Sequence, residues 1–314
     1  MSIPVTGPPG AEMREYVLQP AKSRLTKHKI LCLNVSGTLT TVETGGLLGT
    51  NPSVTEDVRD ALKKALDDER IEAVVVQIDS RGGEVTASDA IYEEIRRFKQ
   101  ARQEKKRPVK VLASIAAMGA SGGYYVALAA DKIYAYPTSI TGSIGVIATF
   151  PNLAGLVSKI GVDIRVIKSA DKKDSGSLWR DFTPEERTIM QSVIDEFYQR
   201  FVEVVAQNRP GLDRKTVLAL ADGRIYTGPQ ALENKLIDGI GYMDDVFEKA
   251  KEAAGIKDAA VVTYRRPSGL RVGLYAQSPA PAPQTGNQVN LLQINGAGVF
   301  EPSRRPGFYY LWLP

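Results

Sequence analysis

Histidine and cysteine are nearly absent from this sequence, which has one of each among 314 residues. Because Cys32 is the sole cysteine, no intramolecular disulfide can form, and its apolar neighbours favour a buried, inert thiol. Because His28 is the sole histidine, metal sites built from several histidine or cysteine ligands are excluded. We therefore expect no metal centre, and nothing in the sequence indicates a cofactor.

Long apolar runs are also missing from the chain. No stretch reaches the length of about 18 apolar residues that a membrane-spanning helix needs. The polar, proline-containing start lacks the charged and apolar regions of a signal peptide. The net charge of +4, from 40 basic and 36 acidic residues, gives no reason to expect nucleic-acid binding. As written, the chain is expected to be soluble and to have no membrane span.

Short apolar runs alternate with stretches of helical periodicity from residue 29 to residue 264. The nearly continuous apolar run at 71–78 is typical of a strand buried in a parallel sheet. Further strands are predicted at 30–35, 108–115, 131–136, 162–167 and 261–262. Between 138 and 143 we expect a loop. This alternation predicts an α/β domain with a mostly parallel sheet flanked by helices.

Capping boxes mark the start of two predicted helices, one at Ser53 with Glu56 and one at Thr183 with Glu186. The second helix is long, and its periodicity predicts five inward-facing side chains, namely Ile189, Val193, Phe197, Phe201 and Val204. Further helices are predicted at 87–98, 213–221, 228–236 and 243–254.

Composition divides the chain into three parts. Residues 1–28 contain four prolines and are expected to form a flexible lead-in. Residues 29–264 are expected to form one domain. Residues 265–314 form a proline-containing tail with a strongly apolar end at 308–314, which is too short to span a bilayer. We expect this end to dock on protein or to stay exposed.

The stretch MGASGGYY at 118–125 contains the pattern G-x-S-x-G around Ser121, the signature of the nucleophile elbow in α/β-hydrolases. That fold requires a histidine after the serine, and none follows Ser121; another chain order would have to use His28. A lysine can serve as the base instead, if burial lowers its pKa from about 10.4 by roughly two to three units. Taken alone, such glycines more often serve close packing than catalysis.

A second glycine pair, Gly82-Gly83, follows the predicted strand at 71–78. Successive backbone N–H groups at such a position can face an oxyanion, and glycine leaves room for a substrate. An oxyanion hole built from Gly83 and Gly122 is mechanistically coherent. By itself, however, the pair fits a simple turn equally well.

Five segments together resemble signal peptide peptidase A, a family of Ser-Lys serine peptidases. They are VQIDSRGGEVTASDAIYEEI (76–95), MGASGGYYVALAADKIYA (118–135), TSITGSIGVI (138–147), IKSADKKDSGS (167–177) and ADGRIYTGPQALENKLIDGIG (221–241). The match covers residues 29–264, which would then be the peptidase domain. It implies the Clp protease/crotonase-like fold, built of ββα units. Two departures are Arg81, where the family commonly has proline, and Ala170, where it usually has glycine.

The resemblance also implies roles for single residues. The nucleophile of the family falls on Ser121 and its general-base lysine on Lys173, with Lys172 and Lys168 as rivals. The serine that orients the lysine falls on Ser143, and the oxyanion glycines fall on Gly83 and Gly122. Tyr124 and Tyr125 are expected to pack the following helix.

The function implied is that of a serine endopeptidase acting on hydrophobic peptides such as signal-peptide remnants. The resemblance also implies a homo-oligomer whose active sites are shared between neighbouring subunits, and the apolar tail could lie in a subunit's own substrate groove. The family is associated with membranes on the extracytoplasmic side, whereas a chain without a signal or span could be cytoplasmic. Two alternatives stay open: a crotonase-type acyl-CoA enzyme, and a non-catalytic oligomeric scaffold of the same fold.

Overall fold

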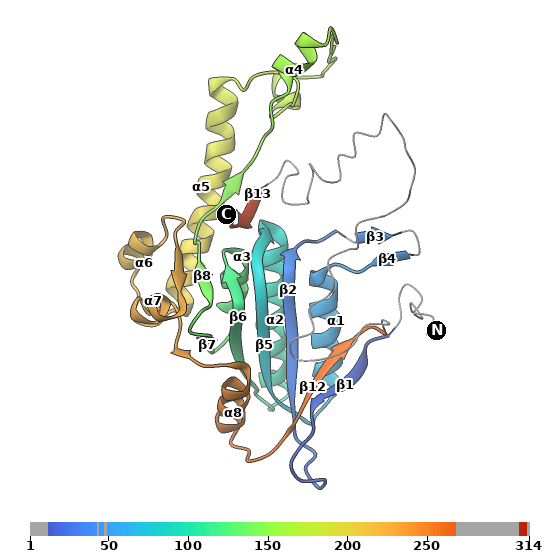
Figure 1. Ribbon diagram of the computed structural model, residues 1–314, viewed down its shortest axis with the longest axis vertical. Coiled ribbons are helices and arrows are strands. Elements are labelled where there is room, and N and C mark those ends of the chain that lie inside the picture. Colours follow the sequence, from blue (N-terminus) through green and yellow to red (C-terminus); the bar gives the residue numbers. More distant parts are fainter. Residues whose placement is uncertain (1–11, 43, 47–48, 268–307, 313–314) are drawn as a thin grey trace.

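The computed structural model describes residues 12–42, 44–46, 49–267 and 308–312. Its centre is a twisted sheet with the strand order β1-β12-β2-β5-β6-β7-β11 (Figure 1). These strands are β1 (Arg14–Gln19), β2 (Lys29–Leu39), β5 (Ile71–Glu84), β6 (Lys110–Ala120), β7 (Lys132–Ala135), β11 (Gly239–Ile240) and β12 (Ala260–Arg265). The other strands are β3 (Thr44–Gly46), β4 (Gly49–Asn51), β8 (Ile140–Gly142), β9 (Ile147–Ala148), β10 (Ile225–Thr227) and β13 (Phe308–Leu311).

Most strand pairs are parallel, including the central run from β12 through β2, β5, β6 and β7 to β11. Antiparallel pairs such as β1 with β12 and β10 with β8 lie at the margins, and β13 pairs antiparallel with the end of the central strand β5. The predicted α/β class, with a mostly parallel sheet flanked by helices, is therefore confirmed. The architecture agrees with the Clp protease/crotonase-like fold that the resemblance implies.

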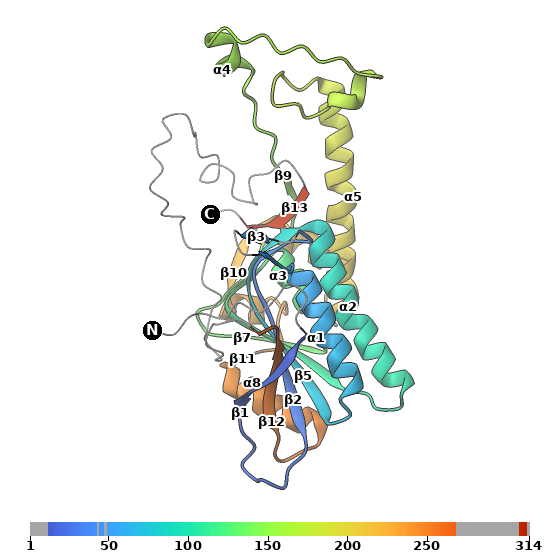
Figure 2. The same ribbon diagram turned by 90° about the vertical axis from the view of Figure 1, so that its right-hand side faces the viewer.

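Helices cover both faces of the sheet (Figure 2). Alternate side chains of β2 divide between two cores, with Leu31 and Leu33 on one side and Ile30 and Cys32 on the other. The first core is closed by α1 (Val54–Asp67), α2 (Val85–Glu104) and α3 (Gly122–Ala127), and the second by α8 (Met243–Ala254). Burial in the second core raises the pKa of the Cys32 thiol to about 12, as suits an inert cysteine.

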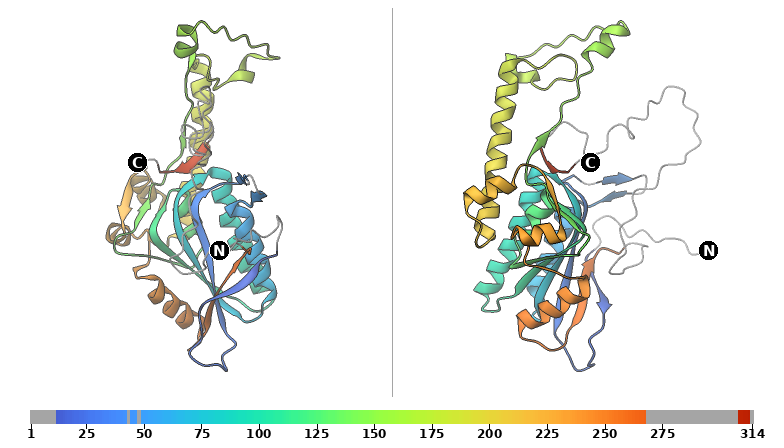
Figure 3. Two further views of the ribbon diagram at one scale, coloured as in Figure 1. Left: turned by 45° about the vertical axis from the view of Figure 1, so that its right-hand side comes forward. Right: turned by 60° about the vertical axis from the view of Figure 1, so that its left-hand side comes forward.

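An arm formed by residues 149–183 projects beyond the sheet, between β9 and the long helix α5 (Pro184–Asn208) (Figures 1 and 3). It carries α4 (Ala154–Lys159) and the single-turn helix η1 (Asp171–Asp174), and no residue from 151 to 185 is buried. The strand predicted at 162–167 is wrong, because this segment is irregular and pairs with no described strand. Ile189, expected to face inward, is 40% exposed because it lies on the outer half of α5.

Two other segments differ from the sequence-based expectation. Within the predicted flexible lead-in 1–28, residues 14–19 form β1, which pairs with β12 and covers the edge of the sheet. Within the predicted loop 138–143, β8 pairs with β6 and with β10. Both strands depend on partners far away in the sequence, which local patterns cannot reveal. The proposed division at residues 28 and 264 stays a prediction.

Predicted helices in the last part of the domain are confirmed as α6 (Arg214–Leu220), α7 (Gly228–Glu233) and α8. Both capping boxes are also present, at Ser53 for α1 and at Thr183 for α5. No helix within the described ranges is long and apolar enough to cross a membrane.

Candidate active site

Ser121 lies in a strained turn between the end of β6 and the first turn of α3. Its backbone angles are φ 53° and ψ −115°, outside the regions that residues with a side chain normally adopt. Its backbone N–H donates a 2.7 Å hydrogen bond to the carbonyl oxygen of Gly142, which helps to hold the turn. The Ser121 side chain is 1% exposed, and its hydroxyl bonds to no other residue in the described part of the chain. A sharp strand-to-helix turn of this kind is the geometry of a nucleophile elbow.

The glycine pair at the end of β5 packs directly against this turn. Gly82 has a φ of 97°, and a Cβ atom there would lie 2.7 Å from the backbone nitrogen of Gly122. A Cβ atom on Gly122 would in turn lie 2.3 Å from Ser88 Oγ and 3.1 Å from Gly82 Cα. Only glycine fits at either position, so the two segments approach each other backbone to backbone. Gly83, the predicted oxyanion donor, follows Gly82 directly.

Ser143 lies at the same edge of the sheet, immediately after β8. In the ladder between β6 and β8, Ala120 pairs with Gly142, so Ser121 and Ser143 follow at matching positions. Ser143 also has a positive φ, 50°, and its backbone N–H donates a 2.8 Å bond to the carbonyl oxygen of Arg224. Its side chain is buried. Four of the five predicted site residues are therefore brought together: Ser121, Ser143, Gly83 and Gly122.

Lys173 is the fifth predicted residue, and it lies apart from the others. It belongs to η1 on the projecting arm, where its side chain is exposed. The views in Figures 1 and 2 both show the arm extending away from α3. Within one chain, the structure therefore does not bring the predicted base to Ser121.

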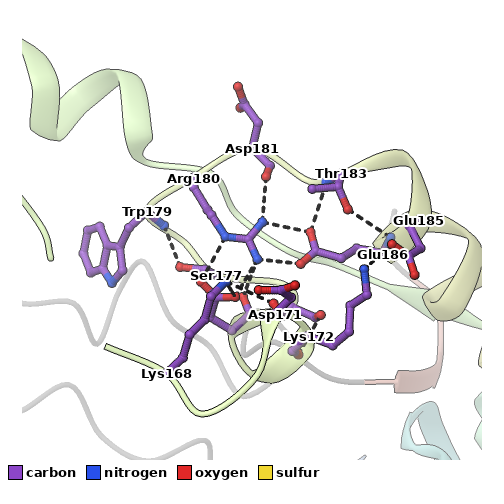
Figure 4. A network of polar contacts seen from close by, with 12 residues as sticks. Lys168, Asp171, Lys172, Ser177, Trp179, Arg180, Asp181, Thr183, Glu185 and Glu186 are labelled. Atoms are coloured by element: carbon purple, nitrogen blue, oxygen red, sulfur yellow. Dashed lines mark hydrogen bonds and ion pairs between the residues drawn. The ribbon is translucent and has the colours of Figure 1, made fainter. Parts of the chain in front are cut away.

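The rival lysines are already engaged in ion pairs. Lys168 Nζ lies 2.8 Å from Asp174 Oδ1, and Lys172 is paired with Glu185 (Figure 4). In contrast, the Lys173 side chain makes no ion pair or hydrogen bond with any residue that the structure describes. Lys173 is thus the lysine of this segment that is free to meet another group.

Arg180 fixes the helix that carries Lys173. Its guanidinium donates to Asp174 Oδ1 at 2.7 Å and to Glu186 Oε2 at 2.9 Å (Figure 4). These charge-assisted bonds hold the pKa of Asp174 well below its usual range. The same guanidinium, with the backbone N–H of Thr183, lowers the pKa of Glu186 to about 2. The turn that carries Lys173 is therefore fastened to the start of α5.

Other candidate groups can be placed as well. His28 lies just before β2, and its Nδ1 is 2.9 Å from Glu72 Oε1. This is the amino end of a parallel strand, roughly 35 Å of strand length from the carboxyl ends where Ser121 lies. A histidine base is thereby excluded within this chain. Tyr124 and Tyr125 are fully buried, as expected of packing residues, and donate to Leu236 O and Asp89 respectively. No group of three or more metal-ligating side chains occurs among the described residues.

Sequence reasoning named Gly82 as part of the glycine pair without giving it a role of its own, and it did not single out Arg180. The glycine pair was itself a signal for Gly82, whose positive φ makes the contact with Gly122 possible. Nothing in the sequence around Arg180 distinguishes it from the other arginines of the chain.

Comparisons with known proteins place these features in a family. A family model described as Peptidase family S49 matches residues 101–257. The chain is 35% identical over 254 residues to an Enterococcus faecium protein named putative signal peptide peptidase SppA, which covers 81% of this chain and 71% of the relative. It is 30% identical over 248 residues to the chloroplastic serine protease SPPA of Arabidopsis thaliana, which covers 77% of this chain and 35% of that protein.

Among solved structures, a ClpP1 mutant from Listeria monocytogenes has a TM-score of 0.42 and 17% identity, covering 70% of this chain and 94% of that chain. The resemblance to signal peptide peptidase A is confirmed by the family match and by the extent of the bacterial relative. The chain belongs to peptidase family S49.

Proposed function

We propose that the chain is a serine endopeptidase that hydrolyses hydrophobic peptides, such as signal-peptide remnants, with Ser121 as its nucleophile. The observation that carries this proposal is the strained Ser121 turn packed directly against Gly82. The names of two S49 relatives, a signal peptide peptidase and a serine protease, support the same activity and substrate class.

In the proposed cycle, the neutral amine of Lys173 removes the proton of Ser121 Oγ while this oxygen attacks the carbonyl carbon of a peptide bond. The lysine then gives that proton to the leaving amine, so that one product departs and an acyl-serine remains. Next, the lysine takes a proton from a water molecule whose oxygen attacks the acyl carbon. The proton returns to Ser121 Oγ when the acid product leaves. Ser143 would hydrogen-bond the amine of Lys173 and hold it oriented towards Ser121 Oγ.

The backbone N–H groups of Gly83 and Gly122 would stabilise the oxyanion of each tetrahedral intermediate. Loss of one such donor typically costs about 2.7–4 kcal/mol of transition-state stabilisation. The close packing of Gly82 on Gly122 supports this assignment, because it puts the two backbone segments within reach of one oxygen atom.

We infer that the lysine is supplied by a neighbouring subunit of a homo-oligomer. The arm exposes many aliphatic side chains, among them Leu156, Ile160, Val162, Val166 and Ile167. Apolar surface of this extent, on a segment without any buried residue, is typical of an interaction site. Docking of this arm on the next subunit would also remove water from its lysine, and desolvation favours the neutral form that a base needs.

The test is a hydrolysis assay on a hydrophobic internally quenched peptide, across pH, for the wild-type chain, Ser121→Ala and Lys173→Ala. We expect each variant to lose more than about a thousandfold in kcat/KM. We also expect the wild-type rate to rise with pH in a single step, as the base loses its proton. Unchanged thermal unfolding would show that the variants are folded.

Lys172→Ala is the matched control, because it removes a neighbouring lysine that is paired with Glu185 on the surface. It should stay within about twofold of wild type, since exposed ion pairs contribute little. Full activity of Ser121→Ala would reject the peptidase mechanism. Loss in Lys172→Ala with activity kept in Lys173→Ala would move the base by one residue.

A further inference from the structure

The last described residues of the chain lie as an extended strand along the end of β5. β13 pairs antiparallel with β5, so that Tyr310 is opposite Gly83 and Leu311 is opposite Gly82 (Figure 1). Extended peptides bind to proteins in the same way, by adding a strand to an exposed edge. β13 can therefore stand in for a bound peptide, and its neighbours on β5 are the groups that a substrate would meet.

The register puts the carbonyl group of Tyr310 at the proposed oxyanion hole. Its oxygen lies 1.9 Å from where a Cβ atom of Gly82 would be, and 3.0 Å from that of Gly122. The side chain of the same residue holds this register, because it is buried in an aromatic pocket that includes Tyr125 and Phe201. Tyr310 thus stands in for the residue whose carbonyl carbon is attacked, and the residues after it stand in for the leaving-group side.

Trp312 takes the place of the second residue after the cleaved bond, and Arg81 lies opposite it. The backbone N–H of Trp312 donates a 3.0 Å hydrogen bond to the carbonyl oxygen of Arg81, which continues the ladder beyond β13. Residues opposite each other in an antiparallel ladder share one face of the sheet, with Cβ atoms about 4.5–5.5 Å apart. We therefore expect the Arg81 side chain to lie beside the side chain of this substrate residue.

The Arg81 guanidinium is half-buried and has no ion pair or hydrogen bond with any residue that the structure describes. The nearest carboxylates in the sequence bond to other groups. Asp79 accepts a 3.2 Å hydrogen bond from the backbone N–H of Met118, and Glu84 accepts three bonds from residues 40–41. A half-buried cation without a counter-charge favours an incoming anion.

The chain's own segment does not supply that anion, because it has tryptophan at position 312. A carboxylate is the group that suits a guanidinium, since the two can form a pair of parallel charge-assisted hydrogen bonds. Arg81 is also a departure from the family pattern, in which proline is common at this place. Proline carries no charge, so this contact is expected in the present chain and not in relatives with proline.

We propose that Arg81 is a specificity-determining residue, which selects substrates with a carboxylate on the second residue after the cleaved bond. The proposal rests on the proposed function of the Ser121 site. The carboxylate can belong to an acidic side chain or to the C-terminus of a peptide that ends at this residue. We expect glutamate to exceed glutamine at this position by about 3- to 10-fold in kcat/KM. Lysine should fall below glutamine, because it would bring a second positive charge to the arginine.

The experiment uses the full chain in its assembled form and the peptides Pro-Gly-Phe-Tyr-Tyr-Leu-X-Leu, where X is glutamate, glutamine or lysine. This sequence follows residues 306–313, with X at the position of Trp312, and acetyl and amide caps remove the terminal charges. Any competition by the enzyme's own tail lowers every rate by the same factor, so ratios of kcat/KM report the contact at X. Mass spectrometry should locate the cut between the second tyrosine and leucine.

A second pair of peptides tests the other source of the carboxylate. Both end with tryptophan at the position of X, one as the free acid and the other as the amide. Faster cleavage of the free acid would assign Arg81 to a terminal carboxylate, whereas a preference for glutamate alone would assign it to a side chain. Equal rates in both comparisons, or a cut at another bond, would overturn the proposal.

Variants of Arg81 connect the preference to this side chain. Arg81→Met keeps an aliphatic stem and removes the charge, so the ratio of glutamate to glutamine should fall to about one. Arg81→Glu should invert the order and favour lysine. A preference for the carboxylate that survives in Arg81→Met would show that another group selects it.

Arg265→Met is the matched control. Arg265 is also a half-buried arginine at the end of a strand, but its strand β12 is separated from β13 by β2 and β5. This variant should keep the wild-type ratio. Loss of the preference in Arg265→Met as well as in Arg81→Met would count against a contact with Arg81.

Failure of the proposed function would look different. If the wild-type chain cut no peptide faster than Ser121→Ala does, the peptidase proposal would fail, and binding would decide on Arg81. Affinities for the same peptides would then be compared between Ser121→Ala and the double variant Ser121→Ala/Arg81→Met. Tighter binding of the peptide with the carboxylate, lost in the double variant, would support the role of Arg81. Equal affinities on Ser121→Ala, both for glutamate and glutamine and for acid and amide, would reject it.

Discussion

Tyr310 lies opposite Gly83 in the ladder between β13 and β5, and its carbonyl oxygen packs against Gly82 and Gly122. The chain thus places one of its own backbone segments where a peptide substrate is expected to bind. This relationship agrees with the expectation that the apolar end docks on protein, and it suggests that the segment competes with substrate.

Removal of residues 308–314 should therefore activate the enzyme. A site that is free for only a fraction of the time binds substrate with an affinity reduced by that fraction. We expect kcat/KM for a hydrophobic peptide to rise about fivefold or more in the shortened chain. Tyr310→Ala, which keeps the chain length but empties the aromatic pocket, should give a smaller rise. Unchanged kcat/KM in both variants, with subunit assembly intact, would show that the segment does not compete.

Gly82→Ala should abolish most of the activity, because the new methyl group would clash with the backbone nitrogen of Gly122 and with the carbonyl oxygen of Tyr310, where a substrate carbonyl is expected to bind. We expect kcat/KM to fall at least about a hundredfold, as for loss of an oxyanion donor. Gly211→Ala is the control, since Gly211 has a similar φ of 88° but no atoms within 4 Å of a Cβ atom. Both variants should lose about 1–2 kcal/mol of stability from the positive φ, and Gly82→Ala should lose more because of its backbone clash, as measured by urea unfolding. Equal activities in the two variants would contradict this account.

Arg180→Met should loosen the turn that carries Lys173 without touching the reacting groups. Arg180 bonds to both Asp174 and Glu186, so its loss leaves η1 joined to the start of α5 by the exposed Lys172–Glu185 ion pair. We expect kcat to fall about tenfold with little change in KM. We also expect a shift in the pH at which the rate begins to rise. Arg165→Met, which removes an exposed ion pair with Asp163 on the same arm, should have no such effect. A wild-type pH profile in Arg180→Met would argue against this positioning role.

Acid should weaken the same network. The pKa of Glu186 is lowered from 4.5 to about 2 by Arg180 and by the N–H of Thr183. Because the folded pKa is the lower one, the stabilisation is fully present above about pH 4.5 and is lost as the pH falls towards about 2. The free energy of unfolding should therefore be higher for wild type than for Glu186→Gln at neutral pH. The difference between the two should shrink as the pH falls through this acid range. A difference that is independent of pH would show that the charge of Glu186 is not responsible.

Local signals explain what the sequence could predict. Some features depend on residues that are neighbours in the sequence, so a short segment is enough to predict them. They include the capping boxes at Ser53 and Thr183 and the turn around Ser121. The run at 162–167 shows the limit of such patterns. Its alternating apolar residues resemble a strand, but in one chain they are exposed on the arm. Periodicity shows that side chains need a partner and does not say which partner.

Long-range contacts explain what the sequence could not predict. The packing of Gly82 on Gly122 joins two strand ends, and the bonds of Arg180 join η1 to α5. The place of Tyr310 beside Gly83 joins residues more than 200 positions apart. No local propensity encodes these contacts. The resemblance to a family led to the proposal of Ser121 as the nucleophile, because a family motif is readable from consecutive residues even where the contacts it brings together are not.

The most direct test of the account is to mix two inactive chains, Ser121→Ala and Lys173→Ala, by co-expression. If each site takes its serine from one subunit and its lysine from the next, random mixing should restore about a quarter of wild-type activity. Ser121→Ala mixed with the double variant Ser121→Ala/Lys173→Ala should stay inactive and serves as the control. A mixture of the two single variants that assembles normally and yet stays as inactive as either alone would contradict the shared site.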